Sequence, residues 1–233
     1  MKAMIFAAGR GQRMRPLTDA TPKPLLAVGG KPLIVWTIEA LARAGFTEIV
    51  INHAWLGEQI PAALGDGSRW GVRLAYSAEG DALETAGGIA QAAGLLAGDG
   101  NVFAAVSGDI WTDFDFASLR PRAAAMAAAP APQMHLVMVD NPPFHPHGDF
   151  GLDDGKLVAD GGTRLTFGNI GLYDLRSFAG IAPGTIMPMT PLYRDHIARG
   201  CATGERFAGA WENVGTPAQL AELDARLRAT ASA

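Results

Sequence analysis

The first half of the chain alternates short apolar runs with segments whose apolar residues recur at helical spacing. The runs "AMIFAA", "TEIVIN", "GVRLAYS" and "NVFAAVSGD" have the length and continuity of buried strands. Between them stand "KPLIVWTIEALARAG", "AWLGEQIPAAL" and "ALETAGGIAQAAGLLAG", which predict helices, the second interrupted by Pro61. Strand–helix repetition at this spacing requires a parallel sheet with right-handed crossovers. We therefore predict a doubly wound, Rossmann-like α/β fold with a mostly parallel, mixed sheet.

The second half is less regular. "RPRAAAMAAAPAPQ" predicts a short surface helix and a proline-stiffened connection, and residues 141–162 predict a long loop with a hairpin. Strands are expected at "MHLVMVD" and "RLTFGNIGLYD", and helices at "PLYRDHIARG" and after Pro217. We expect one domain over residues 1–233, made of a first half (1–120), a smaller lobe (134–215) and a C-terminal helix (216–233).

Composition narrows the class of protein. Apolar residues make up 48% of the chain, enough for a substantial core. Cys201 is the only cysteine, so no intrachain disulfide can form and a reducing compartment is expected. No apolar run approaches the roughly 18 residues that a membrane span needs. These features predict a cytoplasmic protein without a membrane or nucleic-acid partner, since a formal net charge of −4 argues against a broad basic face.

The loop after the first strand is unusually basic. Residues 1–31 contain six cations against Asp19 alone, a net charge of +5, so the remaining residues carry −9. The loop holds G-x-G-x-R, Gly9 to Arg13, but it lacks the third glycine of a dinucleotide fingerprint and has no G-x-x-x-x-G-K-[ST]. Glycines let backbone N–H groups approach phosphates, and Pro16, Pro22 and Pro24 should keep the loop extended. The alternative is a solvated basic loop.

A polar turn follows the fourth predicted strand. "SGDI" should share one mouth with the basic loop, because ligands of such sheets bind beyond the carboxyl ends of the strands. Together the two segments predict a site for a small anionic ligand, a triphosphate, with Arg13 and Lys23 as charge clamps. The alternative for Asp109 is a turn residue or an N-cap.

The segment "MIFAAGRGQRMRPLTDATPKPLLAVGGKPLI" resembles the signature loop of the sugar-1-phosphate nucleotidylyltransferases. Further along, "INHAWLGEQI", "YSAEGDALETAGGI", "SGDIWTDFDF" and "VDNPPFHPHGDF" resemble one branch closely, the N-acetylmuramate-1-phosphate uridylyltransferases of peptidoglycan recycling. The resemblance spans most of the chain and is weakest across the Ala/Pro stretch. It implies transfer of UMP from UTP to N-acetyl-α-D-muramate 1-phosphate, giving UDP-N-acetylmuramate and pyrophosphate.

The resemblance also implies roles for individual residues. Arg13 and Lys23 would neutralise the triphosphate, and Asp109 would hold Mg²⁺. The nucleotide would be bound by Gly9, Gly11, Arg13, Lys23, Glu79, Thr85, Ala86, Gly87 and Gly88. The sugar phosphate would be bound by Asp140, Asn141, Gly148, Asp149 and Asn169. Ala86 departs from the glycine expected in "ETGGG", so its methyl group could crowd the base or be tolerated.

"WENVGT" departs from the W-x-D-x-G-T pattern of the family, whose aspartate is the second metal ligand. Asn213 stands at that position, preceded by Glu212. Asn213 could coordinate Mg²⁺ weakly, Glu212 could substitute, or the site could be impaired. We favour coordination by Asn213, because a shift to Glu212 would move the side chain to the other face of a strand.

Other functions remain open at this point. The nearest is a mannose-, heptose- or glucose-1-phosphate nucleotidylyltransferase that uses another nucleoside triphosphate. A module that senses nucleotides without turnover is a second, and a dinucleotide-binding oxidoreductase a distant third. No C-terminal helical or β-helix extension is apparent, so a monomer or a simple homodimer is expected.

Overall fold

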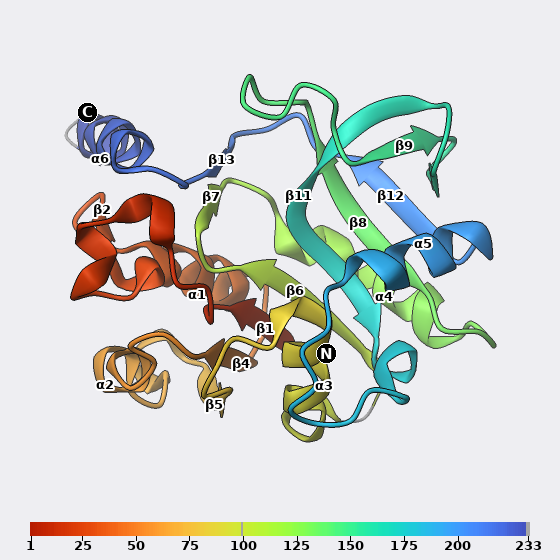
Figure 1. Cartoon of the computed structure of the whole chain (residues 1–233), viewed down its shortest axis with the longest axis horizontal. Helices are drawn as coiled ribbons and strands as arrows, with labels where there is room; N and C mark the ends of the chain where they lie inside the picture. The colour runs from red at the N-terminus through yellow and green to blue at the C-terminus, as the bar shows by residue number, and fades with distance from the viewer. Residues whose placement is uncertain (99, 232–233) are drawn as a thin grey trace.

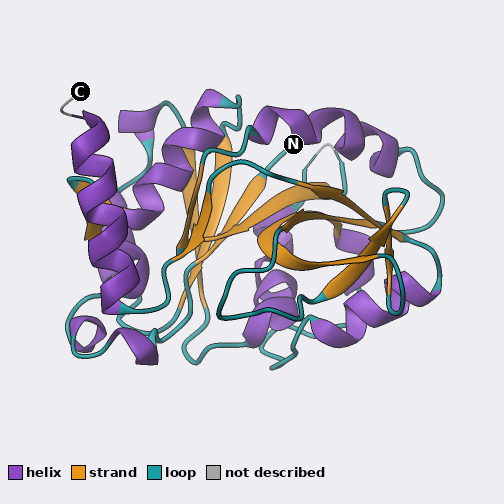
Figure 2. Cartoon of the chain, turned by 90° about the horizontal axis from the view of Figure 1, so that it is seen from above, coloured by secondary structure: helices purple, strands orange, loops and turns teal. Residues whose placement is uncertain are grey.

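A computed structural model describes residues 1–98 and 100–231. Within these residues, nine strands form one sheet in the order β5-β4-β1-β6-β11-β8-β12-β10-β9, with helices on both faces (Figures 1 and 2). The predicted α/β fold with a mixed sheet is confirmed. No helix in the described part of the chain is both long and apolar enough to cross a bilayer. Residues 232–233 of the expected C-terminal segment lie outside the described residues.

The N-terminal half of the sheet is parallel. Its strands are β1 (Ala3–Phe6), β4 (Glu48–His53), β5 (Arg73–Ala78) and β6 (Val102–Ser107). The helices between and after them are α1 (Leu33–Arg43), α2 (Gln59–Leu64), α3 (Glu84–Leu96) and α4 (Leu119–Ala127). Helix α2 begins later than the predicted segment "AWLGEQIPAAL", because residues 54–58 form turns and Pro61 falls within the first helical turn, where its missing N–H costs nothing.

The C-terminal half is mixed and curls back on itself. Its strands are β8 (Met134–Val139), β9 (Phe150–Asp153), β10 (Lys156–Val158), β11 (Thr163–Asp174) and β12 (Ala202–Arg206). β11 runs antiparallel to both β6 and β8, and its first residues also pair with β9. Helix α5 (Thr190–Ala198) packs beside this part of the sheet (Figure 1). The hairpin predicted within residues 141–162 is the pair β9–β10.

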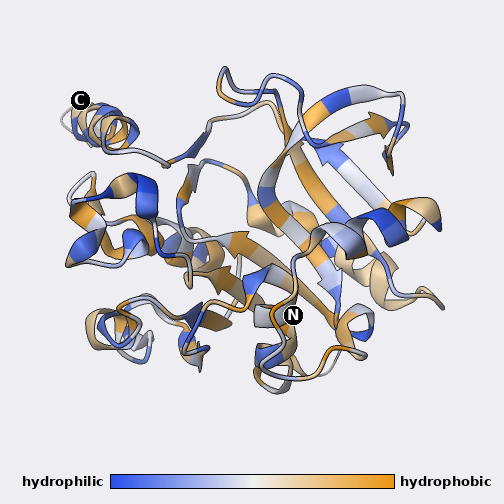
Figure 3. Cartoon of the chain, in the orientation of Figure 1, coloured by the Kyte–Doolittle hydropathy of each residue, from blue (hydrophilic) through white to orange (hydrophobic). Residues whose placement is uncertain are grey.

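Alternation along the strands divides the core into two layers. Ala3 and Ile5 of β1 face a cluster formed with α1, α2 and α4, whereas Met4 faces a cluster formed with α3 and α5. Successive strand residues point to opposite faces, so a strand covered on both faces must be apolar throughout. The central strands accordingly carry hydrophobic colours along much of their length in Figure 3.

The basic loop is compact, which differs from the extended loop predicted from its prolines. Residues 12–14, 17–19 and 23–25 form three short 3-10 turns. Each turn closes with a backbone hydrogen bond, such as Met14 N–H to Gly11 O and Leu25 N–H to Pro22 O. A single 3-10 turn is closed by the N–H of its last residue. A proline at the start of the turn therefore removes no hydrogen bond that the turn needs.

A third apolar cluster ties the two ends of the chain together. Short strands β2 (Ala27–Val28) and β3 (Lys31–Pro32) follow the basic loop, and helix α6 (Pro217–Ala231) packs on them. Leu223 and Leu227 of α6 are buried against Met14 and Val28. The strands β7 (Ile110–Thr112) and β13 (Trp211–Asn213) pair with each other just before α6 begins.

Candidate active site

The carboxyl ends of the parallel strands set the position of the site. Strand register places Asn52, Phe6 and Ser107 side by side at the end of β4, β1 and β6. The basic loop leaves β1 at this point and the Asp109 turn leaves β6. The two segments therefore share one mouth, as the sequence predicted.

Lys23 and Asp109 meet there, although 86 residues separate them in sequence. Lys23 Nζ donates to Asp109 Oδ2 at 2.5 Å. Lys23 is 8% exposed, and the Asp109 side chain is 31% exposed. Both residues line a cavity of about 370 Å³, together with Gly9, Arg10 and Thr85. An ammonium and a carboxylate thus face the same space, which is what binding a triphosphate and a divalent ion requires.

Arg13 lies beside the segment that carries Asn213. Its guanidinium approaches Gly215, where a Cβ would stand 3.3 Å from Arg13 Nη2. Gly215 follows Val214, whose N–H donates to Asp109 O at 3.0 Å. Arg13 is therefore at the same end of the sheet as the Lys23–Asp109 pair, but it is not part of the cavity wall that Lys23 lines.

The two loop glycines have different tasks. Gly11 has a φ of +64°, and a side chain there would press on Thr18 and Lys23, so a glycine is required for the turn to close. A Cβ on Gly9 would stand in open space at the cavity wall. Gly9 leaves its backbone accessible to a ligand, whereas Gly11 shapes the loop that carries Lys23.

Glu79 acts as a brace within the cavity wall. Asn52 Nδ2 donates to Glu79 Oε1 at 2.6 Å, and the Leu83 N–H donates to Glu79 Oε2 at 2.9 Å. Asn52 Oδ1 in turn accepts from the Ala7 N–H at 3.0 Å. The chain of contacts fixes the start of the basic loop against the segment before α3. Sequence reasoning missed Asn52, although a polar residue at the carboxyl end of an apolar strand is a usable signal.

The glycine-rich start of α3 packs against the chain before α5. The Ala86 and Gly87 N–H groups both donate to Met187 O, at 3.0 and 3.1 Å. A Cβ on Gly87 would collide with Thr185 O, and one on Gly88 would lie 2.5 Å from Glu79 Oε1. These backbone groups are occupied within the protein. Nucleotide binding by Ala86, Gly87 and Gly88 stays a prediction, and the geometry gives all three a packing role.

The side chain of Asn213 has a buried oxygen without a hydrogen-bond donor among the described residues. Asn213 pairs with Ile110 across the β7–β13 ladder, one residue from the Asp109 turn. Its Oδ1 is buried and receives no hydrogen bond from the described residues. A buried acceptor without a donor is costly, so the position suits a cation. Glu212 differs, because it pairs with Arg226 of α6.

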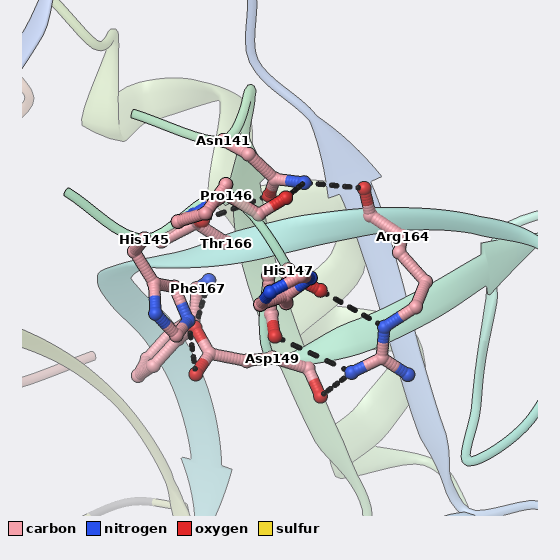
Figure 4. Close-up of polar contacts among 9 residues, drawn as sticks. Asn141, His145, Pro146, His147, Asp149, Arg164, Thr166 and Phe167 are labelled. Carbon is pink, nitrogen blue, oxygen red and sulfur yellow. Dashed lines mark hydrogen bonds and ion pairs between the residues drawn. The ribbon is translucent and has the colours of Figure 1, made fainter. Parts of the chain in front are cut away.

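The predicted sugar-phosphate residues fall into a braced loop and one strand position (Figure 4). Asn141 Oδ1 accepts from Thr166, and its Nδ2 donates to Pro146 O and Arg164 O. Asp149 accepts from the Phe167 N–H at 2.8 Å and contacts His145 Nε2 at 3.1 Å. Gly148 has a φ of +59°, and a Cβ there would lie 2.6 Å from Asn141 Oδ1. This network holds the loop against β11.

Asp140 stands apart from that network. Arg206 Nε and Nη2 donate to its two oxygens at 2.8 and 2.9 Å, and these bonds hold the pKa of the Asp140 carboxyl below its usual value. Both side chains are exposed, and Asp140 borders a second cavity. Sugar-phosphate binding by Asp140, Asn141, Gly148 and Asp149 stays a prediction.

Among the predicted sugar-phosphate residues, Asn169 lines two neighbouring cavities. It lies at an irregularity of β11 with a φ of +58°, and it lines a cavity of about 680 Å³ together with Asn213. A smaller cavity of about 240 Å³ shares Asn169 and Tyr193 with the large one, and shares Thr85 and Ser107 with the nucleotide-side cavity. The shared walls make one trough from the Lys23–Asp109 pair to Asn213. Glu84, with a φ of +62°, borders it as well and was also missed.

Comparisons with known proteins show the family of the chain. The nucleotidyl transferase family model matches residues 2–158, which carry the basic loop and the Asp109 turn. The chain belongs to the nucleotidyl transferase family. The predicted membership is thereby confirmed, and the oxidoreductase alternative is set aside.

Two relatives match this nucleotidyl transferase over nearly its full length. N-acetylmuramate alpha-1-phosphate uridylyltransferase of Neisseria meningitidis is 51% identical over 97% of both chains. The protein of the same name from Caulobacter vibrioides is 33% identical over 97% of this chain and 96% of its own. A solved Bacillus anthracis structure, assigned as a glucose-1-phosphate thymidylyltransferase, covers 98% of this chain with a TM-score of 0.84 at 21% identity, which bears on the fold.

Proposed function

We propose that the protein transfers UMP from UTP to N-acetyl-α-D-muramate 1-phosphate and releases pyrophosphate. The observation that carries the reaction class is the contact of Lys23 with Asp109 at one wall of a cavity large enough for part of a nucleotide. The substrate pair is supported by the full-length similarity to two relatives that carry the name of this activity. The product, a UDP-linked muramate, belongs to peptidoglycan recycling.

The chemistry needs no proton acceptor from the protein. A sugar phosphate has a second pKa of about 6, so its oxygen is already anionic at neutral pH. That oxygen forms a bond to the α-phosphorus of UTP while the bond from the α-phosphorus to the bridging oxygen of pyrophosphate breaks. The obstacle is repulsion between anions, so the protein contributes positioning and positive charge. Lys23 faces the cavity directly, and Arg13 supplies charge from the neighbouring turn.

The residues present fit a magnesium ion. Asp109 offers a partly exposed carboxylate, and Asn213 offers a buried carbonyl oxygen without a donor among the described residues. Mg²⁺ prefers oxygen ligands and takes few of them from the protein when phosphates supply the rest. When bound, it would add positive charge at the phosphate oxygens. This donor set makes Asp109 and Asn213 the residues that would hold it.

We also propose that the reaction takes place in the cytoplasm. Nucleoside triphosphates and a protein with one unpaired cysteine both suit the cytoplasm. A monomer or a simple homodimer remains our proposal for the assembly.

A coupled pyrophosphate assay tests the function. UTP with N-acetylmuramate 1-phosphate should release pyrophosphate when Mg²⁺ is present and should release none after chelation. GTP, CTP, dTTP and ATP, each with mannose, glucose and heptose 1-phosphates, form the comparison panel. A preference for GTP would overturn the uridylyl assignment. Tight UTP binding without any pyrophosphate release would favour the nucleotide-sensing alternative.

A further inference from the structure

One face of helix α5 borders the large cavity of about 680 Å³. The face is formed by residues spaced three and four apart, namely Thr190, Tyr193, Arg194, Ile197 and Ala198. Residues at this spacing lie on one side of a helix. Because Asn169 and Asn213 line the same cavity, this face looks toward the position where a sugar 1-phosphate would meet the metal ligands.

Arg194 stands out on that face because its charge is free. It forms no ion pair and no hydrogen bond with any described residue. Nearby charges are already matched, since Arg199, the residue directly after α5, pairs with Asp195 at 2.6 Å. Arg194 therefore keeps all five N–H donors available at the cavity wall, in the planar arrangement that matches a carboxylate.

The rest of the cavity wall is short of negative charge. Arg164 also lines it and donates only to backbone carbonyl oxygens, those of His147, Gly148, Asp149 and Ala159. Asp149 is the single acid of the lining, and its oxygens are occupied by His145 and the Phe167 N–H. Two guanidinium groups thus meet no free carboxylate. Such a wall favours an anionic substituent on the ligand.

The proposed substrate carries such a group. N-acetylmuramate differs from N-acetylglucosamine by a lactyl ether, which adds one methyl group and one carboxylate. The 1-phosphate end of the sugar would meet Lys23 and the magnesium ion that Asp109 and Asn213 would hold, so a second anion needs its own cation elsewhere in the trough. Ile197 and Ala198 provide apolar surface beside Arg194 for the methyl group.

We propose that Arg194 binds the lactyl carboxylate and selects carboxylate-bearing sugar 1-phosphates over their neutral counterparts. The inference rests on the proposed function and adds the residue that sets its specificity. A charge-assisted, two-bond contact of this kind is expected to change the preference between the two sugars by about 10- to 100-fold.

The experiment compares two substrates that differ only in the lactyl group. Pyrophosphate release from UTP is measured with N-acetylmuramate 1-phosphate and with N-acetylglucosamine 1-phosphate, and the ratio of their kcat/KM values is the readout. The variants are Arg194→Met, Arg194→Lys and the matched control Arg199→Met, at the residue directly after the same helix. We expect Arg194→Met to lower the ratio about 10- to 100-fold through a higher KM for the muramate. Arg194→Lys should retain part of the ratio, and Arg199→Met should leave it unchanged.

Different results separate the two proposals. If the unmodified protein prefers the muramate and Arg194→Met keeps that preference, the carboxylate is read elsewhere and this inference is wrong while the function stands. If the unmodified protein uses both sugars equally, carboxylate selection is wrong while nucleotidyl transfer stands. If neither sugar is turned over, the proposed function fails. Calorimetric titration of the two sugar phosphates into the same variants then decides the inference, because an unchanged ratio of Kd values in Arg194→Met would overturn it.

Discussion

Lys23 is almost fully buried, yet its ammonium group lies at the wall of a cavity large enough for part of a nucleotide. Burying such a charge is costly, and a buried ion pair is weak evidence for stability. Its contact with Asp109 is therefore better explained by function. Under the proposed function, the pair would place a cation and the proposed metal ligand beside the phosphates of a bound nucleotide.

Replacing Lys23 tests this explanation. Lys23→Met removes the ammonium while keeping much of the aliphatic volume, so kcat/KM for pyrophosphate release should fall about 100- to 1000-fold. Lys31→Met is the matched control, because Lys31 also contacts an acid, Glu39, but lies outside the cavity. Steady-state kinetics with UTP measure both. Equal losses in the two variants would show that the effect is structural.

Asn213 allows a second test at the scale of one atom. Asn213→Asp adds a negative charge at the buried oxygen that has no donor among the described residues. Activity should stay unchanged or rise, and the Mg²⁺ concentration for half-maximal rate should fall about 3- to 10-fold, because ligand charge raises cation affinity. A magnesium titration of the rate measures this. A large loss of activity would mean that the asparagine has another task, and Glu212→Gln tests whether its neighbour is the ligand instead.

At this scale, sequence reasoning succeeded where a residue follows the end of a strand. Lys23 and Asp109 could be brought together because both follow parallel strands at the same edge of the sheet. Asn52 and Ser107 were missed because they lie within the last two residues of their strands and read as part of them. The free charge of Arg194 could not be predicted either, since it depends on which acids lie nearby in space.

Helix α5 shows how one element serves the site on one face and the core on another. His196 is 1% exposed and fully hydrogen-bonded as a neutral ring. Nδ1 donates to Leu192 O at 3.0 Å, which leaves Nε2 to accept from the Ser177 hydroxyl at 3.0 Å. Burial lowers the pKa of His196, and the nearby Arg199 charge acts in the same direction, whereas the hydrogen bond to Leu192 O and the charges of Asp195 and Asp174 oppose the shift without reversing it.

The lowered pKa predicts a pH-dependent stability. Below about pH 6.5 the unfolded chain takes up a proton that buried His196 resists, so the free energy of unfolding should fall as pH decreases. The loss from this one group is at most about 1.4 kcal/mol per pH unit. Urea midpoints at pH 7.5 and pH 5.5 measure it. His196→Gln should show a smaller difference between the two pH values than the unmodified protein, and the exposed His147→Gln should not differ from it.

Elements were predictable to the extent that their apolar pattern was regular. Strands β1, β4, β5, β6, β8 and β11 and helix α1 follow from the apolar pattern. Strand β12 was not predicted, and neither was the shape of the basic loop. Its prolines correctly excluded an α-helix, but they are compatible with 3-10 turns as well as with an extended chain, and the hydrophobic contacts of Met14 and Leu26 favour the compact form.

At the scale of the whole molecule, the C-terminal helix packs beside the site against residues that follow the first strand. Helix α6 lies against the segment that follows the basic loop (Figure 1), and Asp224 accepts from the Gly29 N–H at 2.7 Å across 195 residues. The strand that carries Asn213 leads directly into α6. The C-terminal helix therefore supports both the basic loop and the strand that carries Asn213, the proposed second metal ligand. No local sequence pattern reveals this arrangement, because it depends on contacts between distant segments.

This coupling predicts that a core change in α6 affects the distant loop. Leu223 is fully buried against Met14 and Val28, so Leu223→Ala should lower the free energy of unfolding by about 2–5 kcal/mol. Residues 10–28 should also lose protection in hydrogen exchange, and the KM for UTP should rise because Lys23 is held less firmly. Glu222→Ala, at the adjacent exposed position, is the control. A destabilised Leu223→Ala variant with unchanged loop protection and unchanged KM would show that the basic loop keeps its shape without α6, and that the two ends of the chain are joined for stability alone.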